Sequence, residues 1–253
     1  MSVLRSALFH ALQLVTVVPY ALLCLLWAPL PRPLRYRLTL GWPRLIVHAA
    51  RRLVGIDWRV LGAEHLPDEP AIVLSKHQST WETLFYPIWM PRELCYVFKR
   101  ELLWLPFFGW GIGLLDMIHI DRSRGALAFE QLVREGSIRL AQGRWIVLFP
   151  EGTRTRAGTR IRYKTGGARL AVRTGVPVIP VAVNSGECWP RRALVLRPGT
   201  ITVSIGPPIA STGKTAEALA AEVESWIENE MRRISPHLYE RERDVATATA
   251  PSA

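Results

Sequence analysis

The stretch Ala71–Pro87, AIVLSKHQSTWETLFYP, places a dense group of polar residues between two apolar runs. Its first residues, AIVLS, have the length and β-branched character of a buried strand. The polar group contains an S-x-x-E capping box that predicts a helix starting at Ser79 or Thr80. His77 therefore lies on a strand-to-helix turn, at the carboxyl end of a strand, where open α/β sheets place their functional sites.

From residue 56 onward, short β-rich runs alternate with helical stretches. The strand-like runs are IDWRVLG, AIVLS, LCYVFK, DMIHI, WIVLF, VPVIPVAV and TITVSIG, and the helical stretches cover residues 125–143, 165–175 and 215–234. This alternation predicts an α/β domain with a mostly parallel sheet flanked by helices. We expect the domain over residues 56–238, followed by a disordered tail over 239–253, which is polar and rich in small residues.

The first 55 residues have a different character. Residues 7–31 form an apolar segment of the length that crosses a bilayer, ~20 residues. The segment has no small-residue cleavage site and predicts an uncleaved anchor, with Pro19 at its middle. Residues 36–55 predict an amphipathic helix for the membrane surface, with packing on the domain as the alternative. Whether the apolar segment spans the bilayer or re-enters it stays open at this level.

Charge supports a membrane-associated amino terminus. Residues 1–60 hold eight arginines and one aspartate, which is a net charge of +7 out of +11 for the whole chain of 253 residues. Basic residues beside an apolar segment favour anionic phospholipid over nucleic acid as the partner. Arginines follow the segment more densely than they precede it. We therefore expect the inner (cytoplasmic) membrane as the location, with the catalytic domain on the cytoplasmic side.

Other motifs exclude several classes of protein. Three cysteines far apart argue against a disulfide framework, and no Cys/His pair has zinc-ligand spacing, so we expect no metal site. GPPIASTGKT resembles a phosphate-binding loop, but Pro208 stands where its first glycine belongs. Because proline has no backbone N–H to offer a phosphate, we interpret this stretch as a helix start.

His77 and Glu82 are the candidate reacting pair. A histidine can take a proton near neutral pH, and it works best when a carboxylate orients its ring. Glu82 lies five positions later and also occupies the last position of the capping box. The structural and the catalytic interpretation are compatible, because a cap at Ser79 would carry Glu82 into place.

Two further blocks have the composition of a binding site. FPEGTRTRAG (Phe149–Gly158) follows an apolar strand and joins a flexible glycine to arginines, which suits a phosphate; Lys164 extends the basic surface. The alternative is a solvated basic loop. FKRELLWLPFFGWG (Phe98–Gly111) sets a basic pair before an aromatic, apolar run that suits an acyl chain or the membrane, or ordinary core packing.

Taken together, the blocks resemble the 1-acyl-sn-glycerol-3-phosphate acyltransferases, the lysophosphatidic acid acyltransferases. That family has an H-x-x-x-x-D block, a basic-then-apolar block, an E-G-T-R block and a V-P-V-I-P-V block. Here they read HQSTWE, FKRELLWLPFFGWG, FPEGTRTRAG and VPVIPVAVNSG, in the family's order. The resemblance covers roughly residues 70–190. The one departure is Glu82, which stands in place of the family's aspartate and is one methylene longer.

The resemblance implies catalytic roles for His77, as general base, and for Glu82, which would orient it. A hydroxyl of a lysophospholipid would attack an acyl thioester directly, with acyl-CoA or acyl-carrier protein as co-substrate and with no metal or tightly bound cofactor. The implied substrate-binding residues are Lys99, Arg100, Gly109, Glu151, Gly152, Thr153, Arg154 and Lys164.

Two alternatives remain at this level. One is a sibling acyltransferase that uses another acceptor, such as glycerol 3-phosphate or a lyso-aminolipid. The other is a non-catalytic membrane protein that binds anionic phospholipid through its arginines. The sequence carries no signal for the oligomeric state, the donor type or the length of the acyl chain.

Overall fold

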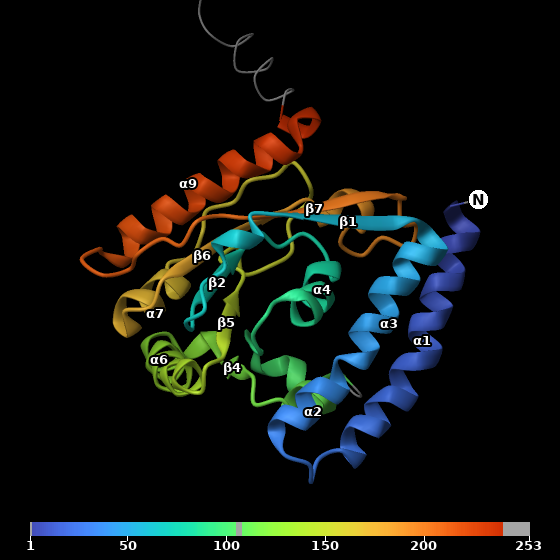
Figure 1. The fold of residues 1–253 in the computed structure, drawn as a ribbon, viewed down its shortest axis with the longest axis horizontal. Coiled ribbons are helices and arrows are strands. Elements are labelled where there is room, and N and C mark those ends of the chain that lie inside the picture. The colour runs from blue at the N-terminus through green and yellow to red at the C-terminus, as the bar shows by residue number, and fades with distance from the viewer. Residues whose placement is uncertain (1, 105–107, 240–253) are drawn as a thin grey trace, which may run out of the picture.

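A computed structural model describes residues 2–104 and 108–239 of the chain. Its centre is a seven-stranded sheet of order β1-β7-β6-β2-β5-β3-β4 (Figure 1). Every pair of neighbours is parallel except β6 and β7, so the predicted mostly parallel sheet is confirmed. The strands are β1 (Ile56–Leu61), β2 (Ile72–Ser75), β3 (Leu94–Lys99), β4 (Ile118–Ile120), β5 (Trp145–Leu148), β6 (Val178–Val183) and β7 (Gly199–Ile205).

Helices cover both faces of the sheet and bury two separate apolar clusters. Successive residues of a strand point to opposite faces. Val73 of β2 therefore joins the cluster under α3 (Gly41–Ala49) and α4, while Ile72 joins the cluster under α6, α7 and α9. Beyond residue 56 the helices are α4 (Trp81–Trp89), α5 (Phe108–Gly113), α6 (Ala126–Ala141), α7 (Gly166–Thr174), α8 (Ser185–Cys188) and α9 (Ala216–Ile234). Short 3₁₀ turns cover Ala63–His65, Arg100–Trp104 and Arg122–Arg124.

The amino-terminal helices differ in their bounds from the prediction. The apolar segment expected over residues 7–31 is α1 (Ser2–Leu26), which continues through Pro19 and ends shortly before two further prolines that cannot donate to a helix. The amphipathic helix expected over residues 36–55 is divided into α2 (Arg32–Thr39), α3 (Gly41–Ala49) and a π-helical turn (Ala50–Val54). Gly55, with a φ of 85°, then turns the chain into β1.

These helices are not a separate unit, although a boundary at residue 55 was expected. Phe9 of α1 and Ile46, Val47 and Ala50 are fully buried in the same apolar cluster as the sheet and α4. Figure 1 shows α1 lying alongside α3 at one side of the molecule. Among the described helices, α1 alone is long and apolar enough to cross a membrane.

At the carboxyl terminus, α9 begins where the glycine- and lysine-containing motif was interpreted as a helix start. Thr215 caps it by accepting a hydrogen bond from the amide of Ala218. The expected tail began at residue 239, but Tyr239 is buried against the second apolar cluster. The rest of that tail, 240–253, lies outside the described residues.

The sheet topology brings distant segments together at one edge. β2 is the central strand, and β5 and β6 pair with it in parallel on its two sides. The carboxyl ends of these three strands therefore lie next to one another. They lead directly into the His77 turn, the block that begins at Phe149, and the short helix that begins at Ser185.

Candidate active site

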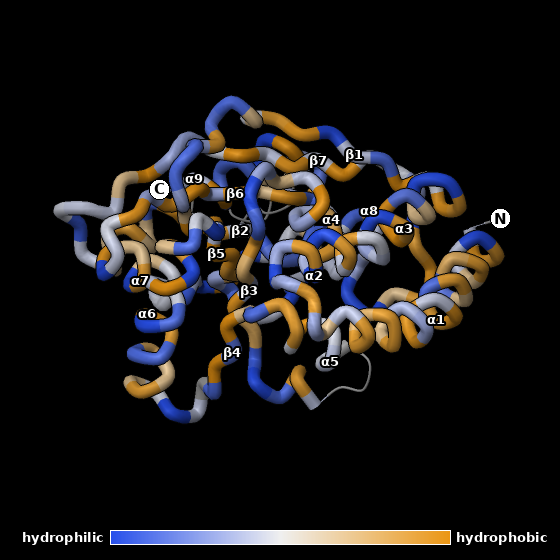
Figure 2. Tube along the Cα trace, turned by 60° about the horizontal axis from the view of Figure 1, so that its bottom comes forward, coloured by the Kyte–Doolittle hydropathy of each residue, from blue (hydrophilic) through white to orange (hydrophobic). Residues whose placement is uncertain are grey.

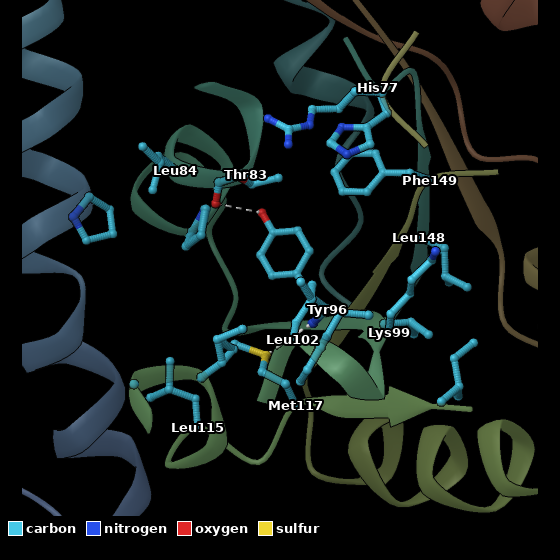
Figure 3. Close-up of a pocket in the computed structure, with 18 of the residues that line it drawn as sticks. His77, Thr83, Leu84, Tyr96, Lys99, Leu102, Leu115, Met117, Leu148 and Phe149 are labelled. Atoms are coloured by element: carbon cyan, nitrogen blue, oxygen red, sulfur yellow. Dashed lines mark hydrogen bonds between the residues drawn. The ribbon is translucent and has the colours of Figure 1, made fainter. Parts of the chain in front are cut away.

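The imidazole of His77 is held from two sides. Its Nδ1 lies 2.9 Å from Oε1 of Glu82, and its ring stacks on Phe149 with centroids 3.8 Å apart and an interplanar angle of 16° (Figure 3). A carboxylate can only accept a hydrogen bond, so Nδ1 carries the proton and Nε2 presents a lone pair. Nε2 has no hydrogen-bond partner among the described residues, and His77 lines a cavity. The ring is arranged to accept a proton from a ligand there.

Glu82 is fully buried, and both of its carboxylate oxygens are used. Oε1 accepts from His77 Nδ1 and from the amides of Gln78 and Ser79, at 2.8–2.9 Å. Oε2 accepts from the hydroxyl of Ser185 at 2.7 Å. The bond to the Ser79 amide is the carboxylate half of the capping box, so one side chain both starts α4 and orients His77.

The block that begins at Phe149 holds the backbone of His77. The amide of His77 donates to Oε2 of Glu151 at 2.8 Å, and its carbonyl accepts from the amide of Thr155, also at 2.8 Å. Gly152 turns this loop with a φ of 72°, a value that favours glycine. Two loops that are more than seventy residues apart in the sequence therefore fix the position of His77.

A buried ionic cluster lies behind this contact. The ammonium of Lys76, fully buried, is 3.3 Å from Oε1 of Glu151 and 2.7 Å from Oε1 of Glu228 on α9. Tyr163 also donates to Glu228, at 2.8 Å, and burial raises the pKa of Tyr163 well above its usual value. Burial likewise raises the pKa of Glu151 to about 8, although Lys76 acts in the opposite direction.

A cavity of about 500 Å³ leads away from His77. This volume is in the usual range for small-molecule sites, about 300–1,000 Å³. Its walls are mainly apolar and come from α1, α4, β3, α5 and the end of β5, with Tyr96, Leu115 and Met117 among the lining side chains (Figure 3). The shape and lining suit a hydrocarbon chain whose reactive end lies at His77.

Four cationic side chains line the cavity, and Arg154 marks its polar end near His77. Arg154 donates to the hydroxyl of Thr80 at 2.6 Å, close to the His77 turn. Lys99, Lys164 and Arg191 also line the cavity, and Arg191 donates to the backbone carbonyl of Arg154 at 3.2 Å. None of these four cations has an ion pair within the described residues. They are therefore available to an anionic group.

Five of the eight predicted substrate-binding residues line this cavity: Lys99, Gly152, Thr153, Arg154 and Lys164. The other three do not. Arg100 is exposed at the start of a 3₁₀ turn. Gly109 is buried where a Cβ would meet the backbone oxygen of Leu103 at 2.2 Å, so its position requires a glycine for packing. Glu151 faces Lys76 and the His77 amide, which is a positioning contact and not one with a substrate.

Three residues of the site were missed from the sequence. Ser185 and Lys76 stand in quoted motifs, but neither has a spacing that signals a role. Glu228 did carry a signal, because it is a charged residue beside Ile227 on the buried stripe of α9. Such a residue on an apolar helix face predicts a buried partner.

Comparison with known proteins identifies the family of this chain. The sequence pattern of the acyltransferase family matches residues 57–184. The chain is 41% identical over 238 residues to a 1-acyl-sn-glycerol-3-phosphate acyltransferase of Pseudomonas aeruginosa, which covers 92% of each chain. This chain belongs to the acyltransferase family. The resemblance found from the four sequence blocks is therefore confirmed, and the protein is an enzyme of the acyltransferase class.

Further relatives extend the agreement. A 1-acyl-sn-glycerol-3-phosphate acyltransferase of Limnanthes douglasii is 30% identical over 211 residues, which is 83% of this chain and 74% of that protein. The crystal structure of the 1-acyl-sn-glycerophosphate acyltransferase PlsC from Thermotoga maritima matches with a TM-score of 0.76. That match covers 92% of this chain and 96% of the other. At 24% identity it supports the fold.

Proposed function

We propose that this acyltransferase moves a fatty acyl group from an acyl thioester to the free sn-2 hydroxyl of lysophosphatidic acid, giving phosphatidic acid. The observation that carries the proposal is the His77–Glu82 pair at the polar end of an apolar cavity, beside cations that have no ion pair among the described residues. The names of the relatives support the same acceptor. A base, a site for an alkyl chain and a site for a phosphate are the three things that this reaction requires.

In the proposed reaction Nε2 of His77 takes the proton from the acceptor hydroxyl. The hydroxyl oxygen attacks the thioester carbonyl carbon, and the carbon–sulfur bond then breaks. The thiol leaves with the proton that His77 had taken, which returns the imidazole to its starting state. Glu82 holds Nδ1–H throughout and stabilises the imidazolium that forms. In this scheme His77 carries out every proton transfer, and no metal or tightly bound cofactor is needed.

The acceptor's phosphate would bind the cations at the polar end of the cavity. Arg154 is held at the His77 turn by its bond to Thr80, and a guanidinium can bind two phosphate oxygens at once. Partial burial lowers the pKa of Arg154, while Glu82 acts in the opposite direction. The acyl chain of the donor, whether from acyl-CoA or acyl-carrier protein, would lie among the apolar residues.

We further propose that the enzyme binds the inner face of the cytoplasmic membrane through α1. Tyr20 on α1 donates to the carbonyl of Leu38 in α2, and Ser6 accepts from the amide of Leu196 in the α/β domain, so both halves of α1 are attached to other parts of the protein. A helix held in this way along its length would lie on the membrane surface more readily than across it. Leu4, Leu14 and Val15 of α1 are each more than half exposed, and Figure 2 colours much of this helix as hydrophobic.

The first test is the release of free thiol from a long-chain acyl thioester in the presence of lysophosphatidic acid. Wild type, His77→Ala and Glu82→Ala are purified in detergent and compared side by side. We expect turnover by wild type and a loss of ~10²–10⁴-fold for His77→Ala, because a positioned base contributes that much. Competition by glycerol 3-phosphate and by a lyso-aminolipid measures the preference for the acceptor.

Two outcomes would contradict the proposal. Full activity in His77→Ala would show that His77 is not the general base. Binding of anionic lipid by wild type with no use of any acyl acceptor would favour a non-catalytic lipid-binding role. A preference for glycerol 3-phosphate or a lyso-aminolipid would keep the mechanism and change the acceptor.

A further inference from the structure

The loop between α8 and β7, residues 190–197, is attached to the amino-terminal half of α1. The amide of Leu196 donates to the hydroxyl of Ser6 at 2.9 Å, and Nε2 of His10 lies 3.1 Å from the carbonyl oxygen of Leu194. Leu196 itself is fully buried. Immediately before the loop, Trp189 packs edge-on against Phe9 with ring centroids 5.1 Å apart. The loop and the helix therefore form one continuous surface.

This surface exposes large apolar side chains on both of its parts. Leu194 is 82% exposed, the highest value among the large exposed hydrophobic residues described, and Val195 beside it is 42% exposed. On α1, Val3, Leu4 and Leu8 are each more than half exposed. Scattered single apolar residues on a surface are ordinary, but Leu194 and Val195 are adjacent on one exposed loop, and clustered exposed apolar side chains indicate an interaction surface.

The same loop carries three exposed arginines: Arg191, Arg192 and Arg197. None of the three forms an ion pair with an acidic residue of the described chain. Apolar side chains flanked by free cations are the composition that binds the interface of an anionic bilayer, where hydrocarbon and charged headgroups meet. An acidic carrier protein would match the arginines but would leave the exposure of Leu194 unexplained.

We propose that the 190–197 loop is a second membrane-contact element that inserts Leu194 and Val195 into an anionic phospholipid surface. Its arginines would meet the phosphate headgroups. This inference rests on the proposed membrane association of the enzyme and adds to it a site outside the amino-terminal helices. Arg191 also lines the catalytic cavity and bonds to the carbonyl of Arg154. The loop therefore places the polar end of the cavity at the bilayer surface, where a lysophospholipid arrives.

The direct test puts a fluorescent probe on the loop of the full chain. The three native cysteines are buried, so a thiol-reactive, polarity-sensitive dye would label Leu194→Cys selectively. Leu127→Cys on α6 is the matched control, because Leu127 is also an exposed leucine, at 66%, but lies on another element. Each labelled protein is mixed with vesicles of phosphatidylglycerol and phosphatidylcholine. Binding is followed separately by sedimentation.

We expect the dye at position 194 to shift its emission to shorter wavelength on these vesicles and to be quenched by lipids with a quencher on the acyl chain. The dye at position 127 should show neither change. If the protein sediments with the vesicles but position 194 behaves like position 127, the loop proposal is overturned while membrane association stands. If the protein does not sediment with vesicles at all, both the loop proposal and the proposed membrane association are wrong. If the dye at position 194 responds to acyl-carrier protein and not to vesicles, the loop binds that protein and the bilayer proposal is wrong.

A second variant tests the consequence for turnover. Leu194→Gln with Val195→Gln removes the apolar contact and changes no residue of the catalytic machinery. We expect a several-fold lower rate on lysophosphatidic acid embedded in anionic vesicles, with an unchanged rate on the same substrate in detergent micelles. Equal rates in both systems would contradict the proposal. An equal fall in both would indicate damage to the fold and also contradict it.

Discussion

Two buried glutamates hold the same histidine, and they do so in different ways. Glu82 binds the imidazole ring and takes its remaining hydrogen bonds from two amides and a hydroxyl. Glu151 binds the backbone amide of His77 and lies beside the ammonium of Lys76. The first contact governs the tautomer and orientation of the imidazole. The second joins the His77 turn to the fold. If His77 is the base that we propose, variants at the two glutamates should separate rate from stability.

The largest expected effect is on kcat, from a change at the contact between Glu82 and the imidazole ring of His77. Glu82→Gln keeps the size of the side chain but removes the charge that stabilises the imidazolium. We expect kcat to fall ~10²–10⁴-fold, with a much smaller change in the free energy of unfolding. Steady-state kinetics and urea unfolding in the same detergent measure the two quantities.

Glu82→Asp is the matched control, because it restores the family's residue and the charge but shortens the side chain by one methylene. It should retain more activity than Glu82→Gln. Equal activity in Glu82→Gln and wild type would show that Glu82 is only a helix cap.

The next effect is on the free energy of unfolding, from a change beside Glu151, which binds the backbone amide of His77. Lys76→Met removes the only cation within bonding distance of Glu151 and Glu228 among the described residues. Removing one partner of a buried ion pair costs about 3–5 kcal/mol, because it leaves buried charge unpaired. We expect a fall of that size in the free energy of unfolding, measured by urea denaturation.

The companion variant, Lys76→Met with Glu151→Gln and Glu228→Gln, removes the ammonium and both ionisable carboxyl groups. It should recover most of the lost stability. If Lys76→Met alone is as stable as wild type, the cluster is not what attaches the catalytic turn to α9.

A smaller effect is expected at Ser185, which donates to the second oxygen of Glu82. A hydrogen bond to a charged group contributes about 1.5–3 kcal/mol. Ser185→Ala should therefore lower kcat about tenfold or more. It should also shift the pH profile of kcat, which a purely structural serine would not do. Ser211→Ala is the control, since Ser211 is also buried and its hydroxyl has no partner among the described residues. Equal kinetics in Ser185→Ala and Ser211→Ala would show that Ser185 has no role in catalysis.

The last prediction concerns pH. Burial raises the pKa of Glu151 from 4.5 to about 8 in the folded protein. Between those two values the folded state holds a proton that the unfolded state has lost, so this group makes stability decrease as pH rises. We expect that contribution to be absent from Glu151→Gln. Urea midpoints of both proteins across this interval test it, and parallel pH dependences would show that Glu151 does not titrate there.

Much of the fold was predictable because it depends on local pattern. All seven strands, and α6, α7 and α9, were predicted within a few residues, since buried strands and amphipathic helices have distinct periodicities. The bounds of α1 and the division between α2 and α3 were not. They depend on tertiary contacts such as the burial of Phe9 and Ile46. For the same reason the expected boundary at residue 55 divides a single apolar core.

The sequence by itself determined that a histidine and an acid stand on a strand-to-helix turn, and that four ordered blocks mark an acyltransferase. Only the tertiary structure decided which groups surround them. Lys76, Ser185 and Glu228 meet the catalytic turn because parallel strands bring distant loops to one edge and α9 packs across the sheet. A buried charge or hydroxyl requires a partner, but the sequence around it does not show where in the chain that partner lies.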